Sequence, residues 1–335
     1  MIRSIAKRGW VGGLVCGALA SMAAGPALAQ GNPAASYPDH QVSFIVPLPP
    51  GGVADLQARL LAEHLRGKWN QPFVIDNRPG GGTSIGMAVL AKSKPDGYTI
   101  GLGNNASTVI LPLLKADMPY DAIKDFAPVS LMNAQGAVIL ANPKRTPISS
   151  FPELLAAARA NPGKLIFGST GLGGGTHLSM ELLMAKAGIK MIHSPYKGST
   201  QQMQDLLGQQ IDFAVDIPTT AWAQVRSGEL RAVGSLGSRR ASFTPDLPAA
   251  KEFVPGAEFT IWNGVMAPAG TPRPIVDKLS AEVRAFLSRP DIIKRLTDQG
   301  VEPVGNTPEE FARAIAEDRA RLKPVIESAG IKLED

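Results

Sequence analysis

The chain alternates short apolar runs with segments whose apolar positions recur three or four residues apart. The short runs are typical of buried strands, and the longer spacing is typical of amphipathic helices. Strands are predicted at 42–46, 73–76, 99–103, 165–167, 191–193, 211–215 and 230–234. Helices are predicted at about 54–66, 83–92, 151–160, 176–187, 199–207 and 219–226. This alternation predicts an α/β architecture of mostly parallel sheets with helices on both faces.

Two helix starts carry a capping pattern. Ser150-x-x-Glu153 and Thr307-x-x-Glu310 each place a hydroxyl at the helix start and a carboxylate three residues later, with a proline in the first turn. In a capping box the two side chains accept from backbone amides that otherwise lack a partner. Asn161-Pro162-Gly163 marks the end of the helix that begins after Ser150.

The domain organisation is predicted from length and from the absence of a linker. A chain of 335 residues predicts about two domains, since a domain averages roughly 150 residues. No glycine-serine linker or low-complexity tract separates two halves, so we expect the chain to cross between domains more than once, near 128–142 and 253–268. One domain is then built from 30–132 and 254–335, the other from 133–253, with a cleft between them.

The basic residues at the N-terminus belong to a predicted targeting segment. Arg3, Lys7 and Arg8 precede an uncharged stretch with an apolar middle, which ends in Ala27-Leu28-Ala29. The apolar run is shorter than the roughly 20 residues that span a bilayer, so residues 1–29 are predicted to be a signal peptide cleaved after Ala29. Cleavage would place the protein outside the cytoplasm.

Composition excludes several classes of protein. With 44% hydrophobic and 19% charged residues the chain is globular rather than disordered, collagenous or a membrane bundle. Removal of the signal peptide lowers the formal net charge from +5 to +2, so no nucleic-acid partner is expected. The single cysteine, Cys16, lies in the same segment, and the mature chain has no thiol for a disulfide, a metal site or a nucleophile.

Two glycine-rich segments follow predicted strands and run directly into predicted helices. They are Pro47-Leu48-Pro49-Pro50-Gly51-Gly52-Val53-Ala54-Asp55 and Gly168-Ser169-Thr170-Gly171-Leu172-Gly173-Gly174-Gly175-Thr176-His177. Ligands of parallel α/β sheets bind at the carboxyl ends of strands, where glycines and helix N-termini present backbone amides. Both segments are therefore predicted to hold an anion such as a carboxylate. The alternative is a tight strand-to-helix turn that binds nothing.

Three further segments after strands could reach the same cleft, at 103–108, 194–200 and 216–220. Asp216 ends an apolar strand, where its carboxylate could hold an ordered water, pair with a ligand amino group or cap the helix behind it. Asp55 lies in the first turn of a helix, where capping is the ordinary role of an acid. Lys197 is expected to be a solvated edge residue.

A search for catalytic patterns finds none with the right context. The chain lacks G-x-x-x-x-G-K-[ST], H-E-x-x-H and G-x-S-x-G, and no G-x-G-x-x-G opens the first helix. Ser194-Pro195-Tyr196-Lys197 matches S-x-x-K by chance, since it lies at a strand end without the accompanying motifs. The four histidines have no metal-ligand spacing, so no catalytic residue, metal or cofactor is assigned.

An ordered series of motifs runs through the whole mature chain. It comprises Pro47 to Asp55 followed by Ala58-Arg59-Leu60, Asp76-Asn77-Arg78-Pro79-Gly80 with Gly82, Pro95-Asp96-Gly97-Tyr98-Thr99, Gly168 to Leu178, Pro195-Tyr196-Lys197-Gly198-Ser199, Trp262-x-Gly264, and Ala267-Pro268-Ala269-Gly270-Thr271-Pro272. With these motifs the chain resembles the periplasmic substrate-binding proteins of tripartite tricarboxylate transporters, often called the Bug family.

The resemblance implies a two-domain Venus-flytrap fold that closes on a small carboxylate and delivers it to membrane permease subunits. It implies a non-catalytic protein, monomeric, that uses no cofactor. The implied ligand residues are Pro50, Gly51, Gly52, Val53 and Asp55 in the first loop, Ser169, Thr170, Gly171, Thr176 and His177 in the second, and Ser107, Thr108 and Asp216 in the pocket wall. Gly174, where many members have serine, and Pro49-Pro50 depart from the family pattern. The ligand classes that the resemblance implies therefore stay open: di- and tricarboxylates, amino-acid carboxylates and aromatic acids.

Two other functions stay open at this point. A receptor of this kind could report its ligand to a membrane sensor kinase instead of a permease. An α/β enzyme acting on carboxylates would need a base and an electrophile, for which the chain offers Asp55, Asp216, His177 and Lys197 as scattered candidates. Turnover of a bound acid would favour the enzyme.

Overall fold

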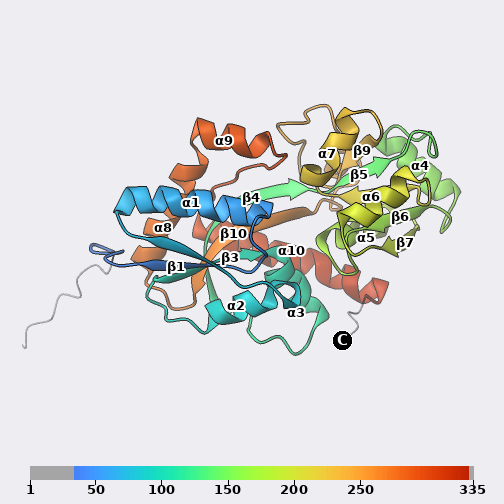
Figure 1. Cartoon of the computed structure of the whole chain (residues 1–335). Coiled ribbons are helices and arrows are strands. Elements are labelled where there is room, and N and C mark those ends of the chain that lie inside the picture. The colour runs from blue at the N-terminus through green and yellow to red at the C-terminus, as the bar shows by residue number, and fades with distance from the viewer. Residues whose placement is uncertain (1–33, 332–335) are drawn as a thin grey trace, which may run out of the picture. The chain divides into compact units, whose positions relative to one another are not determined.

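Two five-stranded sheets form the framework of the protein (Figure 1). The computed structural model describes residues 34–331, and the predicted signal peptide at 1–29 lies outside the described residues. The first sheet has the order β2-β1-β3-β10-β4 and the second the order β7-β6-β8-β5-β9. The strands are β1 (Val42–Val46), β2 (Phe73–Asn77), β3 (Thr99–Asn104), β4 (Phe126–Gly136), β5 (Val138–Ala141), β6 (Ile166–Ser169), β7 (Ile192–Pro195), β8 (Phe213–Asp216), β9 (Arg231–Ser235) and β10 (Thr260–Pro268).

Each sheet is mixed, with one strand running against the other four. In the first sheet β10 is antiparallel to both β3 and β4, whereas β1 is parallel to β2 and β3. In the second sheet β5 is antiparallel to β8 and β9, whereas β6 is parallel to β7 and β8. The reversed strands are those by which the chain enters each sheet from the other. The α/β fold with mostly parallel sheets is confirmed.

Helices cover both faces of each sheet, as predicted. They are α1 (Val53–Trp69), α2 (Ser84–Ala91), α3 (Leu111–Leu114), α4 (Phe151–Ala160), α5 (Gly175–Ala187), α6 (Ser199–Leu207), α7 (Pro218–Arg226), α8 (Arg273–Leu287), α9 (Pro290–Thr297) and α10 (Pro308–Ala329). Successive strand residues point to opposite faces, so Phe44 of β1 packs with α1 and α8 whereas Ile45 packs with α2 and α10. In the second sheet Phe213 packs with α4 and α5, and Ala214 with α6 and α7.

The two capping predictions hold to different degrees. At α10 the Thr307 hydroxyl accepts from Glu310 N at 3.3 Å, and the Glu310 carboxylate accepts from Thr307 N at 2.9 Å, which completes the box. At α4 the Ser150 hydroxyl accepts from Glu153 N at 3.4 Å, but the Glu153 carboxylate accepts from Ser149 N instead. In the pattern at α4, the carboxylate therefore binds an amide one residue before the helix cap.

Helix α10 joins the packing of the two sheets. Its Phe311 and Ile315 share a hydrophobic core with Leu178 and Leu182 of α5, so the helix that follows β6 is braced by the last helix of the chain. These elements belong to one compact unit. Within residues 34–331, every helix is too short or too polar to cross a bilayer.

Candidate functional site

The loops that follow the strands lie at equivalent edges of the two sheets. Because the strand orders correspond, β1 of the first sheet matches β6 of the second, and β3 matches β8. The segments after β1 and β6 lead into α1 and α5, and these are the two glycine-rich loops predicted from the sequence. We call residues 47–55 the first loop and residues 168–177 the second loop. Neighbouring parallel strands end at the same edge, so each loop has β3 or β8 beside it.

Hydroxyl groups and one imidazole shape the second loop. The Thr176 hydroxyl accepts from Thr170 N at 3.1 Å and lies 2.9 Å from the Thr170 hydroxyl. Nδ1 of His177 accepts from Gly173 N at 3.0 Å, which pins the glycine-rich turn to the first turn of α5. Gly174, the N-cap residue of α5, has no side chain that could accept a hydrogen bond, so the first amides of α5 lack a side-chain acceptor.

A stacked histidine pair lies behind the second loop. The rings of His177 and His193 are 3.7 Å apart, and His193 Nε2 lies 2.7 Å from the Ser169 hydroxyl. Since His177 Nδ1 accepts a hydrogen bond, its proton is on Nε2, which faces the Glu181 carboxylate at 3.3 Å. Burial, and then the neighbouring His177, lower the pKa of His193 to about 3. His177 therefore supports the loop through its bond from Gly173 N and its stacking on His193.

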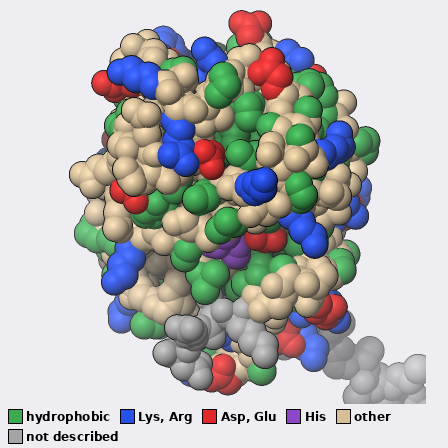
Figure 2. Space-filling view, turned by 90° about the vertical axis from the view of Figure 1, so that its right-hand side faces the viewer, with side chains coloured by type: hydrophobic (Ala, Val, Ile, Leu, Met, Phe, Trp, Pro, Cys, Tyr) green, Lys and Arg blue, Asp and Glu red, His purple; other side chains and the backbone are tan. Residues whose placement is uncertain are grey.

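This histidine pair lines a surface hollow of its own. The hollow has a volume of about 950 Å³ and is lined by both rings, Glu181 and residues near the end of α10. In Figure 2 a small histidine surface lies beside an acidic side chain among hydrophobic groups. The hollow is lined by none of the hydroxyl groups of the second loop. His177 thus lines this hollow, whereas Thr170 and Thr176 line a separate cavity that His177 does not line.

One buried carboxylate shapes the first loop. Asp55 is 1% exposed, and its Oδ2 accepts from Gly51 N and from Arg59 Nε, both at 2.9 Å. Its Oδ1 accepts from Asn77 Nδ2 at 2.9 Å. Burial opposes ionisation of Asp55, but the bonds from Arg59, Gly51 and Asn77 outweigh it and lower the pKa. Asp55 therefore positions the loop, which corresponds to the capping alternative.

The first loop leaves its own backbone open. Pro50, Gly51 and Gly52 are exposed and Val53 is half-buried. Gly52 caps α1 without a side-chain bond, as Gly174 does at α5. The φ of Gly51 is +85°, a left-handed conformation that glycine adopts readily. The loop therefore offers main-chain amides rather than side chains to a ligand.

The turn after β3 is held by side chains that face inward. Asn104 Oδ1 accepts from Ser107 N at 2.9 Å, and the Thr108 hydroxyl donates to Asn104 O at 2.7 Å. Ser107 and Thr108 are fully buried. They maintain this turn, and the residues it presents outward are Asn104, Asn105 and Ala106.

A cavity of about 270 Å³ brings several of these segments together. It is lined by Asn104, Asn105, Ala106, Thr170, Gly175, Thr176, Gly198, Ser199, Asp216, Ile217, Ile261, Trp262 and Asn263. Thr170, Thr176 and Asp216 are thus the sequence-predicted site residues that line it. Ser169, Gly171 and His177 belong to the supporting part of the second loop, and Ser107 and Thr108 support the turn after β3. Pro50, Gly51, Gly52, Val53 and Asp55 do not line this cavity.

Sequence reasoning did not assign the asparagines and the β10 residues of the cavity wall. Asn105 Nδ2 donates to Thr260 O at 3.0 Å, which links the turn after β3 to β10 across 155 residues. Trp262 Nε1 donates to Asp318 of α10 at 2.8 Å, which fixes the indole. A Cβ on Gly175 would lie 3.0 Å from Ile261, so glycine at the start of α5 allows its close approach to β10. The sequence predicted that the segment 103–108 could reach the cleft, but the ligand residues assigned within it were Ser107 and Thr108 and not the two asparagines that precede them.

Asp216 is the ionisable side chain of the cavity wall. Its Oδ1 accepts from the Ser199 hydroxyl at 3.0 Å, from Ile217 N at 2.7 Å and from the Thr220 hydroxyl at 2.8 Å. Its Oδ2 has no hydrogen-bond partner among residues 34–331. Burial raises the pKa of Asp216. The wall contains no lysine, arginine or histidine.

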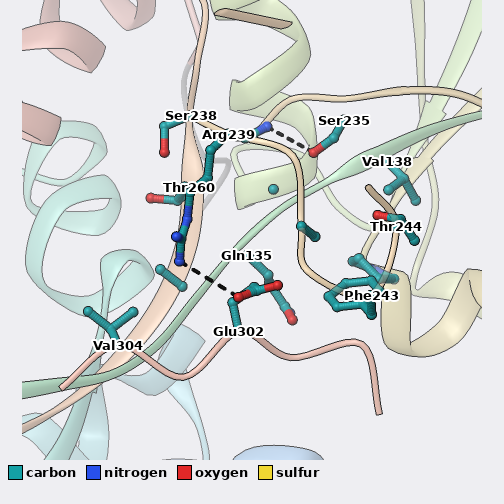
Figure 3. Close-up of a pocket in the computed structure, with 15 residues that line it drawn as sticks. Gln135, Val138, Ser235, Ser238, Arg239, Phe243, Thr244, Thr260, Glu302 and Val304 are labelled. Carbon is teal, nitrogen blue, oxygen red and sulfur yellow. Dashed lines mark hydrogen bonds and ion pairs between the residues drawn. The ribbon is translucent and has the colours of Figure 1, made fainter. Parts of the chain in front are cut away.

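A second cavity lies where the chain passes between the sheets (Figure 3). It has a volume of about 230 Å³, and Gln135, Ser235, Thr260 and Glu302 contribute to its wall. Figure 3 shows Arg239 reaching towards Glu302, at 3.7 Å. None of the sequence-predicted site residues lines this cavity. We therefore place the candidate site at the loop edges of the sheets.

The fold and its loop edges define a ligand receptor of the periplasmic-binding-protein class, and comparisons with known proteins give its family. Residues 57–331 match the tripartite tricarboxylate transporter family receptor. Protein BugT of Bordetella pertussis is 34% identical over 301 residues, covering 89% of this chain and 92% of that protein. The chain belongs to this receptor family.

Two solved structures of relatives contain carboxylates. Rpa4515 of R. palustris with adipate is 33% identical, with a TM-score of 0.74, and the match covers 88% of this chain and 99% of that one. MatC from Rhodopseudomonas palustris with bound malate is 30% identical, with a TM-score of 0.69, and the match covers 87% of this chain and all of that one. The fold of this chain is therefore that of known solute-binding proteins.

Proposed function

We propose that this chain is a periplasmic receptor that binds a small carboxylate between its two lobes and delivers it to the permease subunits of a tripartite tricarboxylate transporter. The lobes are 30–132 with 254–335, and 133–253, and export follows cleavage after Ala29. The protein acts as a monomer, without cofactor or catalysis. The adipate and malate found in the structures of two relatives support the ligand class.

The observation that carries this proposal is the pair of equivalent loops at the starts of α1 and α5. Both helices begin at a glycine without a side-chain cap, so their first amides are free to meet an anion. Each charge-assisted hydrogen bond to a carboxylate contributes roughly 1.5–3 kcal/mol. Four to six such bonds are enough for micromolar affinity after the cost of association.

Ligand binding favours closure of the two lobes only if the ligand contacts both of them. A ligand that touches one lobe alone has the same affinity for open and closed forms and cannot shift their equilibrium. Carboxylate contacts with the first loop and with the second loop favour the closed form. We therefore propose that Pro50, Gly51, Gly52 and Val53 approach the ligand on closure, opposite the second loop.

The direct test is thermal unfolding of the mature protein with a panel of carboxylic acids. A ligand at about 100 times its Kd adds roughly 2.7 kcal/mol to the free energy of unfolding, which raises the midpoint by several degrees. We expect a shift with at least one small carboxylate and none with the corresponding amides or alcohols. No shift with any acid would contradict the proposal.

Bulky replacements of two glycines test the loops. The space around Gly52 and Gly171 accepts a side chain, because the nearest atoms to an added Cβ are Pro49 O at 3.9 Å and Tyr196 O at 4.0 Å. We expect Gly52→Leu and Gly171→Leu to abolish ligand binding while the unfolding midpoint changes little. Gly67→Leu is the control, since an added Cβ there meets no atom within 4 Å and it lies inside α1. Unchanged affinity in both loop variants would contradict the assignment.

A further inference from the structure

Three asparagines line the cavity of about 270 Å³ on the side of the first sheet, and only some of their amide nitrogens are engaged. Asn105 Nδ2 donates to Thr260 O at 3.0 Å, and Asn263 Nδ2 donates to Asn133 Oδ1 at 3.3 Å. Among residues 34–331, by contrast, no atom accepts a hydrogen bond from Asn104 Nδ2. Both hydrogens of the Asn104 amide are therefore free to meet a ligand.

The oxygen of the same amide is held by the protein. Asn104 Oδ1 accepts from Ser107 N at 2.9 Å, from the Ser107 hydroxyl at 3.0 Å and from the Thr83 hydroxyl at 3.5 Å. Ser107 and Thr83 are buried, whereas Asn104 lines the cavity. Because a side-chain amide is planar, bonds that hold its oxygen also fix the direction of its nitrogen. Asn104 thus turns its acceptor to the protein and leaves its donor for the cavity.

The opposite wall of the cavity belongs to the second sheet. Thr170, Gly175 and Thr176 line it there, and the first amides of α5 lack a side-chain acceptor. Asn104 is the last residue of β3, so it faces these groups from the first sheet. The wall has no lysine, arginine or histidine, and a carboxylate in this cavity must therefore be held by neutral donors.

We propose that Asn104 binds the ligand directly, with its Nδ2 donating to a carboxylate held at the start of α5. Ser107 and Thr83 act through Asn104, because they hold its oxygen. The inference rests on the proposed function, since it takes this cavity as the carboxylate site. Asn104 gives the first lobe a contact with the ligand apart from the first loop, so a ligand in the cavity touches both lobes and can favour their closure.

Asn104→Asp separates ligand binding from support of the turn. The new carboxylate still accepts from Ser107 and Thr83, and bonds to a charged acceptor are stronger, so the unfolding midpoint should equal or exceed that of the wild type. A ligand carboxylate would meet a negative oxygen instead of a donor. We expect calorimetric titration with succinate, malate and adipate to show an affinity about 100-fold lower for any of these acids that the wild type binds. If Asn104 only maintained the turn, affinity would stay unchanged.

Asn306→Asp is the matched control. Asn306 Oδ1 accepts from Leu131 N at 2.8 Å, its nitrogen has no acceptor in the described part of the chain, and it does not line the cavity. The same chemical change should leave its affinity at the wild-type value. Full affinity in Asn104→Asp, or an equal loss in both variants, would overturn the inference and leave the proposed function intact. If the wild type binds none of the acids, both fail.

The amide signals in nitrogen–proton NMR spectra report the contact directly. The side-chain NH₂ signals of Asn104 are those missing from the spectrum of Asn104→Asp. We expect them to shift when the wild type is titrated with an acid that it binds, while those of Asn306 stay in place. Ser107→Ala should move the Asn104 signals before any ligand is added and weaken binding about threefold, since one bond to Oδ1 is lost. Asn104 signals that do not shift at saturation would overturn the inference.

Discussion

The first and second loops hold the same position in their sheets but are built from different chemistry. The first is anchored by one ionised carboxylate, Asp55, which accepts from a loop amide, an arginine and an asparagine. The second is anchored without a carboxylate in the loop, by the Thr170 and Thr176 hydroxyls and the stacked rings of His177 and His193. Both arrangements leave uncapped amides at the start of a helix.

This difference shows that the side chains in a loop need not be its ligand-binding groups. Asp55 and His177 are the most distinctive residues of their loops, yet each is buried and satisfied by the protein itself. The loops also differ in exposure, since Gly51 and Gly52 are open whereas Ser169 and Thr176 are buried. The first loop is therefore expected to depend on one anchor, and the second on several weaker ones.

Among substitutions of the residues that anchor the loops, the largest effect is expected for Asp55→Ala. The change removes the acceptor for Gly51 N and leaves Asn77 Nδ2 with the carbonyl of Leu48 alone. Hydrogen bonds to a charged group contribute about 1.5–3 kcal/mol each, so we expect about 2 kcal/mol lower stability and more than a tenfold loss of ligand affinity. Urea unfolding and calorimetry measure the two quantities.

Arg59→Ala is the control for that variant. Arg59 donates to the same Asp55 oxygen, but its side chain is 49% exposed, and such ion pairs contribute about 1 kcal/mol or less. Gly51 and Asn77 still hold Asp55 in this variant. If Arg59→Ala loses as much affinity as Asp55→Ala, the loop conformation does not depend on the amide bond to Gly51.

A smaller effect is expected for the second loop, where the anchors are shared. Thr176→Val removes the acceptor for Thr170 N and should lower stability by about 1 kcal/mol and ligand affinity several-fold. Thr170→Val is the matched change, since it removes the hydroxyl pair but leaves its own amide bonded to Thr176. Equal losses in the two variants would show that the hydroxyl pair, not the amide bond, maintains the loop.

Much of the local structure could be predicted because its signals are local. The strand 42–46 and the helices 151–160 and 199–207 have the predicted bounds, since their apolar spacing and end signals lie within the segments. Helices α8 and α9 were not predicted, although Pro274 and Pro290 in their first turns are start signals. The reversed direction of β5 and β10 depends on pairing between distant segments. The local spacing of apolar residues does not indicate such pairing.

The candidate site was predictable for its loops but not for its wall. Glycines before a helix identify backbone donors wherever they occur, so the loops stand out in the sequence. The role of Asp55 depends on Asn77, 22 residues away, and the place of Asn105 depends on Thr260, 155 residues away. Such partners are set by the fold of the sheets, and sequence spacing alone left the alternatives for Asp55 and Asp216 open.

The smallest effect is expected for a substitution of His193 in the second loop's support. It should change the free energy of unfolding little at neutral pH and more at acidic pH. Its pKa is about 3 in the folded protein, against about 6.5 for an exposed histidine. Between these values the unfolded chain binds the proton that the folded chain excludes, so the free energy of unfolding falls as the pH drops from about 6.5 towards 3 and is constant above.

His193→Gln keeps a polar side chain beside Ser169 but cannot be protonated. We expect its unfolding free energy at pH 7 to be within about 1 kcal/mol of the wild type, and its loss of stability between pH 6.5 and 4 to be smaller. Urea unfolding across this range measures both slopes. The wild-type slope also contains the other groups that titrate there, so the difference between the two proteins is the quantity to compare. Equal slopes would mean that His193 can take up its proton without disturbing the Ser169 end of the second loop.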